Sequence, residues 1–363
     1  MMKIRLKTIS MGILMMVTAA NFSFSQTHYD GQKYFNPFPG FKKRTFGDLL
    51  KWMVWDRLTG KRAIVRSQNH NFEVVKDHRL LKQNANEPLV AWIGHSTLFL
   101  RLDGVNILTD PIFSERCSPF QAVGPKRIVP PGIALDSLPE IDLVLISHDH
   151  YDHLDKNTIL RLGNKPFYLA PAGVGEILRS WGITNFVELD WWEEIGFNQL
   201  KIVCTPAQHF SGRNPFQQNK TLWAGWLIQS RTLNVYYAGD TGYFPGFTEI
   251  KRRYAPIHVA ALPIGAYQPR WFMKPVHMDP PEAVKAFQEL EAEVFIPVHW
   301  GTFKLADEPM DEPPGVLKES AEKSGLQPER FWILKHGEVR SLKIIAQKIE
   351  AAGQERASLT QKR

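Results

Sequence analysis

Cysteine is scarce in this 363-residue chain, which contains only Cys117 and Cys204. A small secreted domain held together by disulfide bonds has many more, so this class of protein is excluded. Cys204 ends an apolar, strand-like run and Cys117 lies in a loop-like segment. One bridge stays open as an alternative, but we favour two separate thiols, and neither has the surroundings of a nucleophile.

A long apolar run is also missing. The run at residues 9–20 is shorter than the ~20 residues that a membrane-spanning helix needs. Three basic residues precede it and small residues follow at 23–25, an order typical of a secretory signal. We therefore predict a signal peptide at residues 1–25, with an uncleaved anchor as the alternative. The mature protein would be exported, either periplasmic or associated with the outer envelope.

Acidic residues are few near the N-terminus, although the whole chain has 44 basic and 37 acidic residues. Residues 26–90 contain twelve basic and six acidic residues, and the part after residue 90 has a net charge of −2. The larger part of the chain therefore lacks the basic balance of a nucleic-acid-binding protein, and we expect no nucleic-acid partner. The basic N-terminal segment suits a membrane surface, with ordinary solubility charge as the alternative.

Residues 26–87 are predicted to form an aromatic and basic N-terminal segment. Residues 34–45 are broken by prolines, so we expect them to be extended and to wrap over another surface. Apolar residues then recur at helical spacing from Phe46 to Leu58, and Trp52 and Trp55 widen the apolar face. This helix either contacts lipid at an interface or packs on the protein's own core, and we expect the second. Residues 59–87 are predicted to be a loop-rich linker.

Short apolar runs separated by turn residues begin at Leu89 and predict strands. The predicted strands span residues 89–93, 97–102, 105–109, 142–146, 167–170, 186–189, 200–205, 222–228, 233–238, 259–263 and 294–297. Helices are predicted near residues 173–181, 247–254 and 280–290, the last capped by Asp279. Two mixed runs of strands, each with helices to cover an outer face, predict an α+β fold with a four-layer αββα sandwich in residues 88–345. Residues 346–363 are predicted to be a polar tail.

One motif, H-x-H-x-D-H, follows the predicted strand at residues 142–146. Residues two apart in extended backbone point to the same side, so His148 and His150 can bind one metal ion. Asp152 and His153 lie past the turn and can reach a second ion. Imidazole and carboxylate ligands suit Zn²⁺, or less often Fe or Mn, and a two-metal site can generate a hydroxide nucleophile at neutral pH. A surface loop that happens to contain three histidines is the alternative, but the pattern is specific.

Three further positions complete this constellation. His209, Asp240 and His299 each lie just beyond an apolar strand, where a rigid sheet can aim a ligand on a loop. Each residue alone is typical of a structural role. Together with the motif, the three predict a complete metal site.

The order of these ligands resembles that of the metallo-β-lactamase superfamily. The resemblance implies the αββα sandwich typical of that superfamily and a binuclear zinc site. It implies that His148, His150 and His209 bind one zinc ion. Asp152, His153 and His299 would bind the other, and Asp240 would bridge the two. Fe or Mn could replace zinc.

Further motifs resemble the N-acyl phosphatidylethanolamine-hydrolysing phospholipase D family. They span residues 92–97, 108–113, 124–127, 188–193, 238–243, 263–267, 270–274 and 298–303. The resemblance covers residues 34–340. The chain departs from the family in its predicted signal peptide, in residues 59–87, and in residues 211–218 beside His209.

The activity implied by this resemblance is hydrolysis of N-acyl phosphatidylethanolamine to N-acylethanolamine and phosphatidic acid. A hydroxide that bridges the metals would attack phosphorus. The implied partners are a phospholipid substrate and a membrane surface, with peripheral membrane contact, and a homodimer is left open.

Several residues outside the ligand set are candidates for the site. Asp240 is both a ligand and a catalytic candidate, and Asp110 would orient the ligands, with capping of the Asp-Pro turn as the alternative. His277 resembles a family residue placed near the reacting phosphate, where it would assist the leaving group, although a lone loop histidine is usually solvated. His95 is expected to be structural. The residues expected to line an acyl-chain groove, unless they are core, are Tyr267, Trp271, Phe272 and Met273.

Two other functions are compatible with the same residues. The first is a secreted metal-dependent hydrolase of a small ester, a lactone or a cyclic phosphodiester, which would have little use for the aromatic N-terminal segment. The second is a lipid-binding envelope protein whose hydrolase fold is vestigial. The presence of all seven ligands argues against the second.

Overall fold

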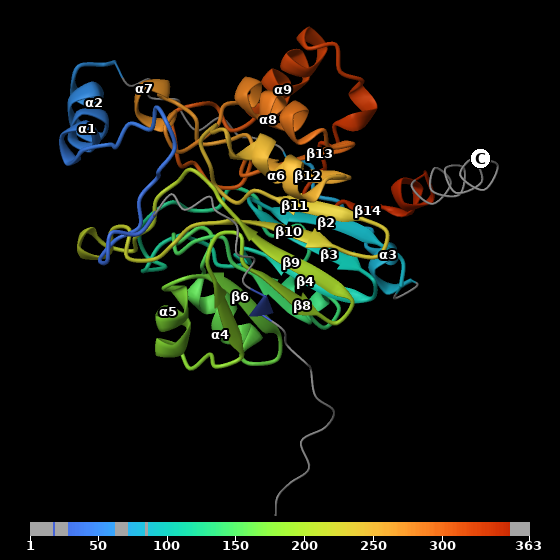
Figure 1. The fold of residues 1–363 in the computed structure, drawn as a ribbon. Coiled ribbons are helices and arrows are strands. Elements are labelled where there is room, and N and C mark those ends of the chain that lie inside the picture. The colour runs from blue at the N-terminus through green and yellow to red at the C-terminus, as the bar shows by residue number, and fades with distance from the viewer. Residues whose placement is uncertain (1–16, 19–27, 62–71, 84–85, 349–363) are drawn as a thin grey trace, which may run out of the picture.

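The computed structural model describes residues 17–18, 28–61, 72–83 and 86–348, and two seven-stranded sheets face each other in it (Figure 1). The first sheet has the order β14-β2-β3-β4-β5-β6-β7 and the second has the order β1-β8-β9-β10-β11-β12-β13. The strands of the first sheet are β2 Leu89–Gly94, β3 Thr97–Leu102, β4 Val105–Thr109, β5 Leu143–Leu145, β6 Phe167–Pro171, β7 Phe186–Leu189 and β14 Val339–Ser341. Those of the second are β1 Val17–Thr18, β8 Glu194–Phe197, β9 Leu200–Thr205, β10 Gly225–Gln229, β11 Asn234–Tyr237, β12 Val259–Pro263 and β13 Val294–Val298.

Helices cover both outer faces of the sandwich. The first sheet is covered by α4 Lys156–Leu162 and α5 Val174–Ser180, and the second by α6 Gly246–Tyr254, α8 Pro280–Leu290 and α9 Glu312–Lys323. The predicted αββα four-layer sandwich is therefore confirmed.

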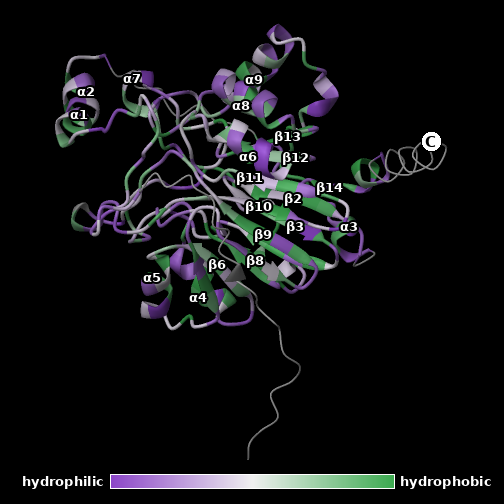
Figure 2. Ribbon diagram, viewed as in Figure 1, coloured by the Kyte–Doolittle hydropathy of each residue, from purple (hydrophilic) through white to green (hydrophobic). Residues whose placement is uncertain are grey.

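The core follows the two-residue period of the strands. In β3, Leu98, Leu100 and Leu102 pack between the two sheets, whereas Phe99 packs toward the helices of the first sheet. In β11, Val235 likewise faces the other sheet and its neighbour Tyr236 faces the helices. Both faces are thus buried in the central strands of each sheet, which is why these strands are largely apolar (Figure 2).

The strand directions bring several loops to one edge of the sandwich. Both β2 and β4 pair antiparallel with β3, and β5 pairs parallel with β4, so β2, β4 and β5 run in the same direction. In the second sheet β9 and β11 both pair antiparallel with β10, and β12 and β13 continue parallel to β11. The residues that follow these strands include all the predicted metal ligands.

Some elements differ from the prediction. Strand β10 begins at Gly225 rather than at Leu222, because Leu222 and Ala224 donate their backbone N–H groups to loop carbonyls of Ala172 and Ser147. The sequence analysis missed β8, β14, α4 and α9. Helix α9 has two consecutive prolines directly after its first residue, Glu312, which look like a helix break but are tolerated in the first turn.

The predicted helix at Phe46–Leu58 is present as α1 Phe46–Leu50, a π-helical turn at Lys51–Trp55 and α2 Asp56–Leu58. The expectation that its apolar face packs on the core is wrong. Trp52 is its one buried hydrophobic residue, and it packs against Phe272 of α7, which spans Arg270–Met273. The exposed side chains are those of Phe46, Leu49, Leu50, Met53, Val54, Trp55 and Leu58. The segment stands away from the sandwich beside α7, so the sheets cannot cover it (Figure 1).

The segment before this helix is extended and wraps over the sandwich, as predicted. The backbone N–H of Tyr34 donates to the carbonyl of Asn219, and Asn36 Nδ2 donates to the carbonyl of His209 at 2.7 Å. Phe38 packs against Trp191 and Phe244. The N-terminal segment therefore reaches a loop that contains a predicted ligand.

The termini are described only in part. Most of the predicted signal peptide lies outside the described residues, except β1, which pairs with β8 at the edge of the second sheet. Near the C-terminus, Ile345 and Ala346 are buried, so the packed part of the chain extends one residue into the predicted tail. Among the described residues, no helix combines the length and apolar character needed to cross a membrane.

The two cysteines form no bridge. Cys117 and Cys204 are both free and buried. Burial raises the pKa of both thiols, so neither is ionised at neutral pH. The preference for two separate, unreactive thiols is confirmed.

Capping of α8 gives a test of local stability. Asp279 accepts a hydrogen bond from the backbone N–H of Glu282 and also pairs with Arg270 at 3.1 Å. We expect Asp279→Ala to lower the free energy of unfolding by about 1 kcal/mol. Asp279→Asn keeps a capping oxygen and should cost less, which urea denaturation of both variants would measure. Equal losses would show that the ion pair, and not the cap, stabilises this helix.

Candidate metal centre

Three histidines form one compact group at the edge of the sandwich. His148 and His150 follow β5, and His209 follows β9. His148 Nε2 lies 2.8 Å and His209 Nε2 lies 3.3 Å from His150 Nδ1, and these nitrogens could hold one ion. Burial holds the pKa of His148 and His209 well below the usual range. Both rings are therefore neutral, the form in which imidazole binds a metal.

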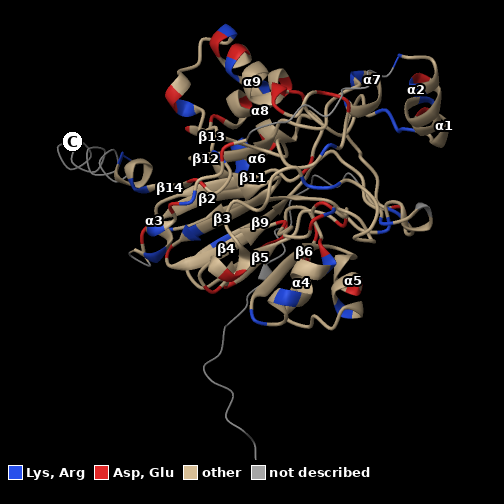
Figure 3. Cartoon of the chain, turned by 180° about the vertical axis from the view of Figure 1, so that it is seen from behind, with Lys and Arg blue, Asp and Glu red and all other residues tan. Residues whose placement is uncertain are grey.

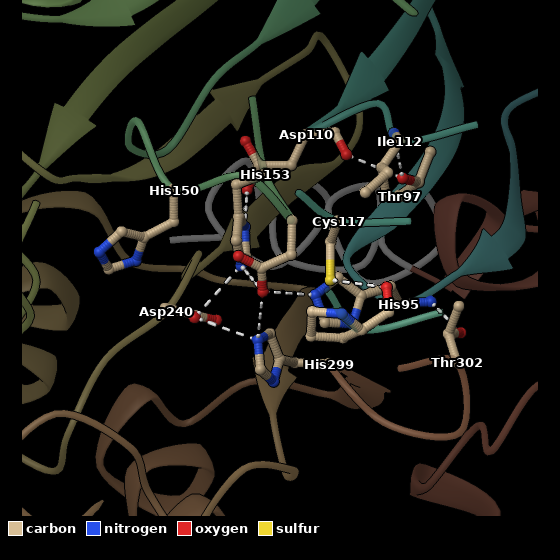
Figure 4. A network of polar contacts seen from close by, with 12 residues as sticks. His95, Thr97, Asp110, Ile112, Cys117, His150, His153, Asp240, His299 and Thr302 are labelled. Carbon is tan, nitrogen blue, oxygen red and sulfur yellow. Dashed lines mark hydrogen bonds and ion pairs between the residues drawn. The ribbon is translucent and has the colours of Figure 1, made fainter. Parts of the chain in front are cut away.

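A second group lies beside the first. His153 Nε2 and His299 Nε2 lie 3.3 Å and 3.4 Å from Asp152 Oδ2. The same two nitrogens lie 3.2 Å and 3.1 Å from Asp240 Oδ2, which is also 3.8 Å from His209 Nε2 (Figure 4). Asp240 thus stands between the two groups. The structure brings all seven predicted ligands together.

The charges of this second group are mutually dependent. Burial opposes ionisation of Asp152 and Asp240, but the neighbouring imidazoles, His153 above all, hold the pKa of both carboxyl groups well below the usual range. For His153 itself, burial works against protonation, but the three surrounding carboxylates outweigh it and raise the pKa. The cluster therefore stabilises a positive charge at its centre.

Unpartnered polar atoms show that the residues suit a metal. Among the described residues, His153 Nε2, His299 Nε2 and Asp240 Oδ1 are buried and have no hydrogen-bond partner. Buried nitrogen and oxygen atoms are normally paired, because an unpaired one costs free energy. The nitrogen and oxygen atoms without a hydrogen-bond partner are of the kind that bind Zn²⁺, Fe and Mn, so this cluster is a candidate metal site.

Asp110 supports the ligands from behind. It follows β4 and is fully buried, and its Oδ2 lies 2.7 Å from His153 Nδ1. It also accepts hydrogen bonds from the backbone N–H and hydroxyl of Ser147, at 2.6 Å and 2.5 Å, and from the hydroxyl of Tyr237. The structure thus places Asp110 where it orients a metal ligand, in agreement with the role suggested by the resemblance.

His95 has a larger part in the site than the sequence indicated. Its Nε2 lies 2.9 Å from Asp152 Oδ2, and its carbonyl accepts the backbone N–H of His299. The motif at residues 92–97 was a signal for this role, but only the fold shows which ligand His95 contacts. His95, Asp110 and His299 all have positive φ angles, of 53°, 35° and 60°, which non-glycine residues rarely adopt.

His277 lies beside Asp240, with its ring 5.1 Å from that of His209 and 5.4 Å from that of His299 between centroids. Its Nδ1 is 4.0 Å from Asp240 Oδ2 and has no hydrogen-bond partner among the described residues. Burial lowers the pKa of His277 to about 3, so the ring is neutral. The alternative that His277 is a solvated residue on a loop is wrong, because His277 is buried.

The four predicted groove residues lie near α7. Phe272 and Met273 are buried with Trp52, and Tyr267 is buried with its hydroxyl donated to Glu312. Trp271 is 45% exposed. An acyl-chain groove along these residues stays a prediction.

A four-layer sandwich with a histidine and aspartate cluster at one edge defines a metal-dependent hydrolase. Residues 105–300 match the family model of the beta-lactamase superfamily domain, which is more than half of the chain. The chain belongs to the metallo-β-lactamase superfamily.

Several relatives are similar over most of the sandwich. A protein of Mycobacterium tuberculosis is 45% identical over 251 residues, which are 67% of this chain and 66% of that protein, slightly less than two thirds. N-acyl-phosphatidylethanolamine-hydrolyzing phospholipase D 1 of Caenorhabditis elegans is 36% identical over 263 residues, 68% of this chain and 74% of the enzyme. Among solved structures, a metallo hydrolase from Ignicoccus hospitalis is 26% identical, with a TM-score of 0.53, and the match covers 70% of this chain and 98% of that one.

Removal of the Asp110 charge should weaken metal binding. Asp110→Asn cannot accept all the hydrogen bonds from His153, Ser147 and Tyr237, and supporting contacts of this kind are worth about 10- to 100-fold in metal affinity. Competition between the protein and a zinc chelator measures the affinity. Asp136→Asn is the control, because Asp136 is on the surface and pairs only with Arg161 among the described residues. Equal zinc affinity of Asp110→Asn and the wild type would contradict this role.

Proposed function

We propose that this protein is a zinc-dependent phosphodiesterase of phospholipase D type that hydrolyses N-acyl phosphatidylethanolamine to N-acylethanolamine and phosphatidic acid. The observation that supports this most is the 36% identity to the Caenorhabditis elegans enzyme, in a chain that retains a complete ligand cluster. A mitochondrial N-acyl-phosphatidylethanolamine-hydrolyzing phospholipase D of Saccharomyces cerevisiae is 37% identical over 245 residues, 65% of this chain and 52% of that enzyme.

In this proposal two zinc ions occupy the cluster. His148, His150 and His209 would hold one ion, Asp152, His153 and His299 the other, and Asp240 would contact both. When bound, the ions supply Lewis acidity toward the phosphoryl oxygens and activation of water. Asp110 and His95 hold the ligands in position through His153 and Asp152.

We assign to His277 the role of assisting the leaving group. Its neutral ring has one N–H and one nitrogen lone pair, and it lies beside Asp240. It can therefore donate a hydrogen bond to the oxygen that leaves phosphorus with the ethanolamide.

We further propose that the exposed face of the helix at Phe46–Leu58 docks on the lipid surface that contains the substrate. Trp55 is 60% and Leu58 is 78% exposed, and Trp52 fixes the helix by donating from Nε1 to Asp307 and by stacking on Phe272. The segment that enters α1 is basic, which favours an anionic surface (Figure 3). An apolar face of this kind on a helix near the site is of little use to a hydrolase of small soluble esters.

The reaction can be tested with N-acyl phosphatidylethanolamine in detergent micelles and the zinc-loaded protein. We expect release of N-acylethanolamine and phosphatidic acid, identified by mass spectrometry, and at least a 100-fold slower release by Asp240→Asn, since this variant loses the bridging charge. Absence of both products from the wild type with zinc bound would overturn the proposal. Lactones, small esters and cyclic phosphodiesters would then be the substrates to test.

Lipid docking can be tested by sedimentation of the protein with anionic vesicles. Replacing both Trp55 and Leu58 with serine should weaken vesicle binding about 100-fold or more, because each side chain contributes roughly 1.5–3 kcal/mol when it leaves water. Ile344→Ser is the control, since Ile344 is 65% exposed but lies at the other end of the chain. Vesicle binding that is the same in the double variant and the wild type would exclude this surface.

A further inference from the structure

Arg44 has unusual surroundings. It lies just before α1, and its Cζ atom lies over two aromatic rings, 4.3 Å from the centroid of Phe210 and 4.7 Å from that of Phe272. Phe210 belongs to the loop after β9, and Phe272 belongs to α7. Three segments that are distant in the sequence thus meet at one charged side chain.

The guanidinium of Arg44 has no directly bonded partner in the described part of the chain, and the carboxylate of Asp48 acts on it only through space. Among the described residues, no carboxylate forms an ion pair with Arg44, and no oxygen accepts a hydrogen bond from its guanidinium. Other partly buried arginines are satisfied: Arg127 donates to the carbonyls of Ser114 and Ile112, and Arg270 pairs with Glu282. Burial lowers the pKa of Arg44 to about 10, which leaves it charged at neutral pH. Arg44 is half-buried and Asp48 does not bond to it, so an anion that accepted its N–H groups would stabilise this charge.

The position of Arg44 is beside the metal centre. The ring of Phe210, on which it stacks, packs 4.5 Å from the ring of His150 and 4.8 Å from that of His209, measured between centroids. One aromatic ring therefore separates Arg44 from two metal ligands.

The guanidinium can still bind a ligand through its N–H groups. A guanidinium is planar and has five N–H groups, and the aromatic rings beside it accept no strong hydrogen bonds. No oxygen of the described residues accepts a hydrogen bond from Arg44, so its N–H groups are available to two oxygens of a phosphate, which the guanidinium fork matches.

We propose that Arg44 is a phosphate-binding residue, which contacts non-bridging oxygens of the substrate phosphodiester beside the metal centre and favours anionic phosphodiesters over neutral esters. This inference rests on the proposed function for its substrate. Its anion-binding part concerns any phosphate, either that of a lipid headgroup or free inorganic phosphate.

The test uses the zinc-loaded full chain and two measurements: inorganic phosphate binding by calorimetry, and kcat and KM for N-acyl phosphatidylethanolamine in micelles. Arg44→Met keeps a long side chain beside the rings, and Arg44→Gln keeps a polar one. We expect each to weaken phosphate binding about 10- to 100-fold, as for loss of a hydrogen bond to a charged group, and to raise KM for the lipid. Arg44→Lys should restore part of both.

Lys43→Gln is the matched control, because it removes the same charge from the exposed neighbouring position. It should change inorganic phosphate binding by no more than about twofold, since exposed charges are screened by salt. Thermal unfolding of each variant shows that it is folded.

The outcomes separate the two proposals. The assignment of Arg44 would be overturned if folded Arg44→Met and Arg44→Gln bound phosphate as tightly as the wild type. It would also be overturned if Lys43→Gln weakened phosphate binding as much as they do. The Arg44 variants could bind phosphate more weakly than the wild type while the wild type fails to hydrolyse the lipid. That result would support the anion site and overturn only the phospholipase function. Weakened phosphate binding with a higher lipid KM would support both.

Discussion

The buried cluster of imidazoles and carboxylates is the constraint on which the rest of this structure depends. His153, Asp240 and His299 are almost completely removed from water, and several of their polar atoms have no hydrogen-bond partner among the described residues. Polar groups in that condition destabilise a protein unless something else binds them. We therefore expect a bound metal to stabilise the folded protein, and the two sheets hold the candidate ligands close together.

The backbone around the cluster is strained. His95, Asp110 and His299 all lie in the left-handed region, and such strain persists only where the surroundings leave the chain no other choice. Each of these residues directly follows a strand and is held by hydrogen bonds, such as that from the backbone N–H of His95 to Thr302 Oγ1 at 2.7 Å. Gly265 has a related role, since a Cβ atom there would lie 1.9 Å from the carbonyl oxygen of His299. The position of His299 therefore depends on the absence of a side chain in the neighbouring strand's loop.

The sequence predicted the parts of the fold that rest on periodicity and spacing. The apolar strands and the seven ligands were found in this way, because each ligand follows a strand whose two faces are both buried. The contact between His95 and Asp152 was not predictable, since it joins loops from β2 and β5 and has no spacing rule. The helix at Phe46–Leu58 shows the same limit: its pattern predicted an apolar face correctly but could not say whether protein or another surface covers it. Lys42, Lys43 and Arg44 are equivalent as a basic run, and only the fold distinguishes the one that lies over two rings.

The N-terminal segment links these observations to the choice of substrate. Asn36 holds the carbonyl of His209, Arg44 stacks beside the ligands, and Trp52 anchors an exposed apolar helix to α7. A catalytic sandwich that acted on small soluble esters would gain nothing from a strap that places a positive charge at the site and an apolar face next to it. A substrate with a phosphate group and long acyl chains, held in a membrane, needs both: the charge meets the phosphate while the apolar helix meets the surrounding lipid. The common origin of these two features in one short segment favours a phospholipid over the smaller substrates that the same metal cluster could hydrolyse.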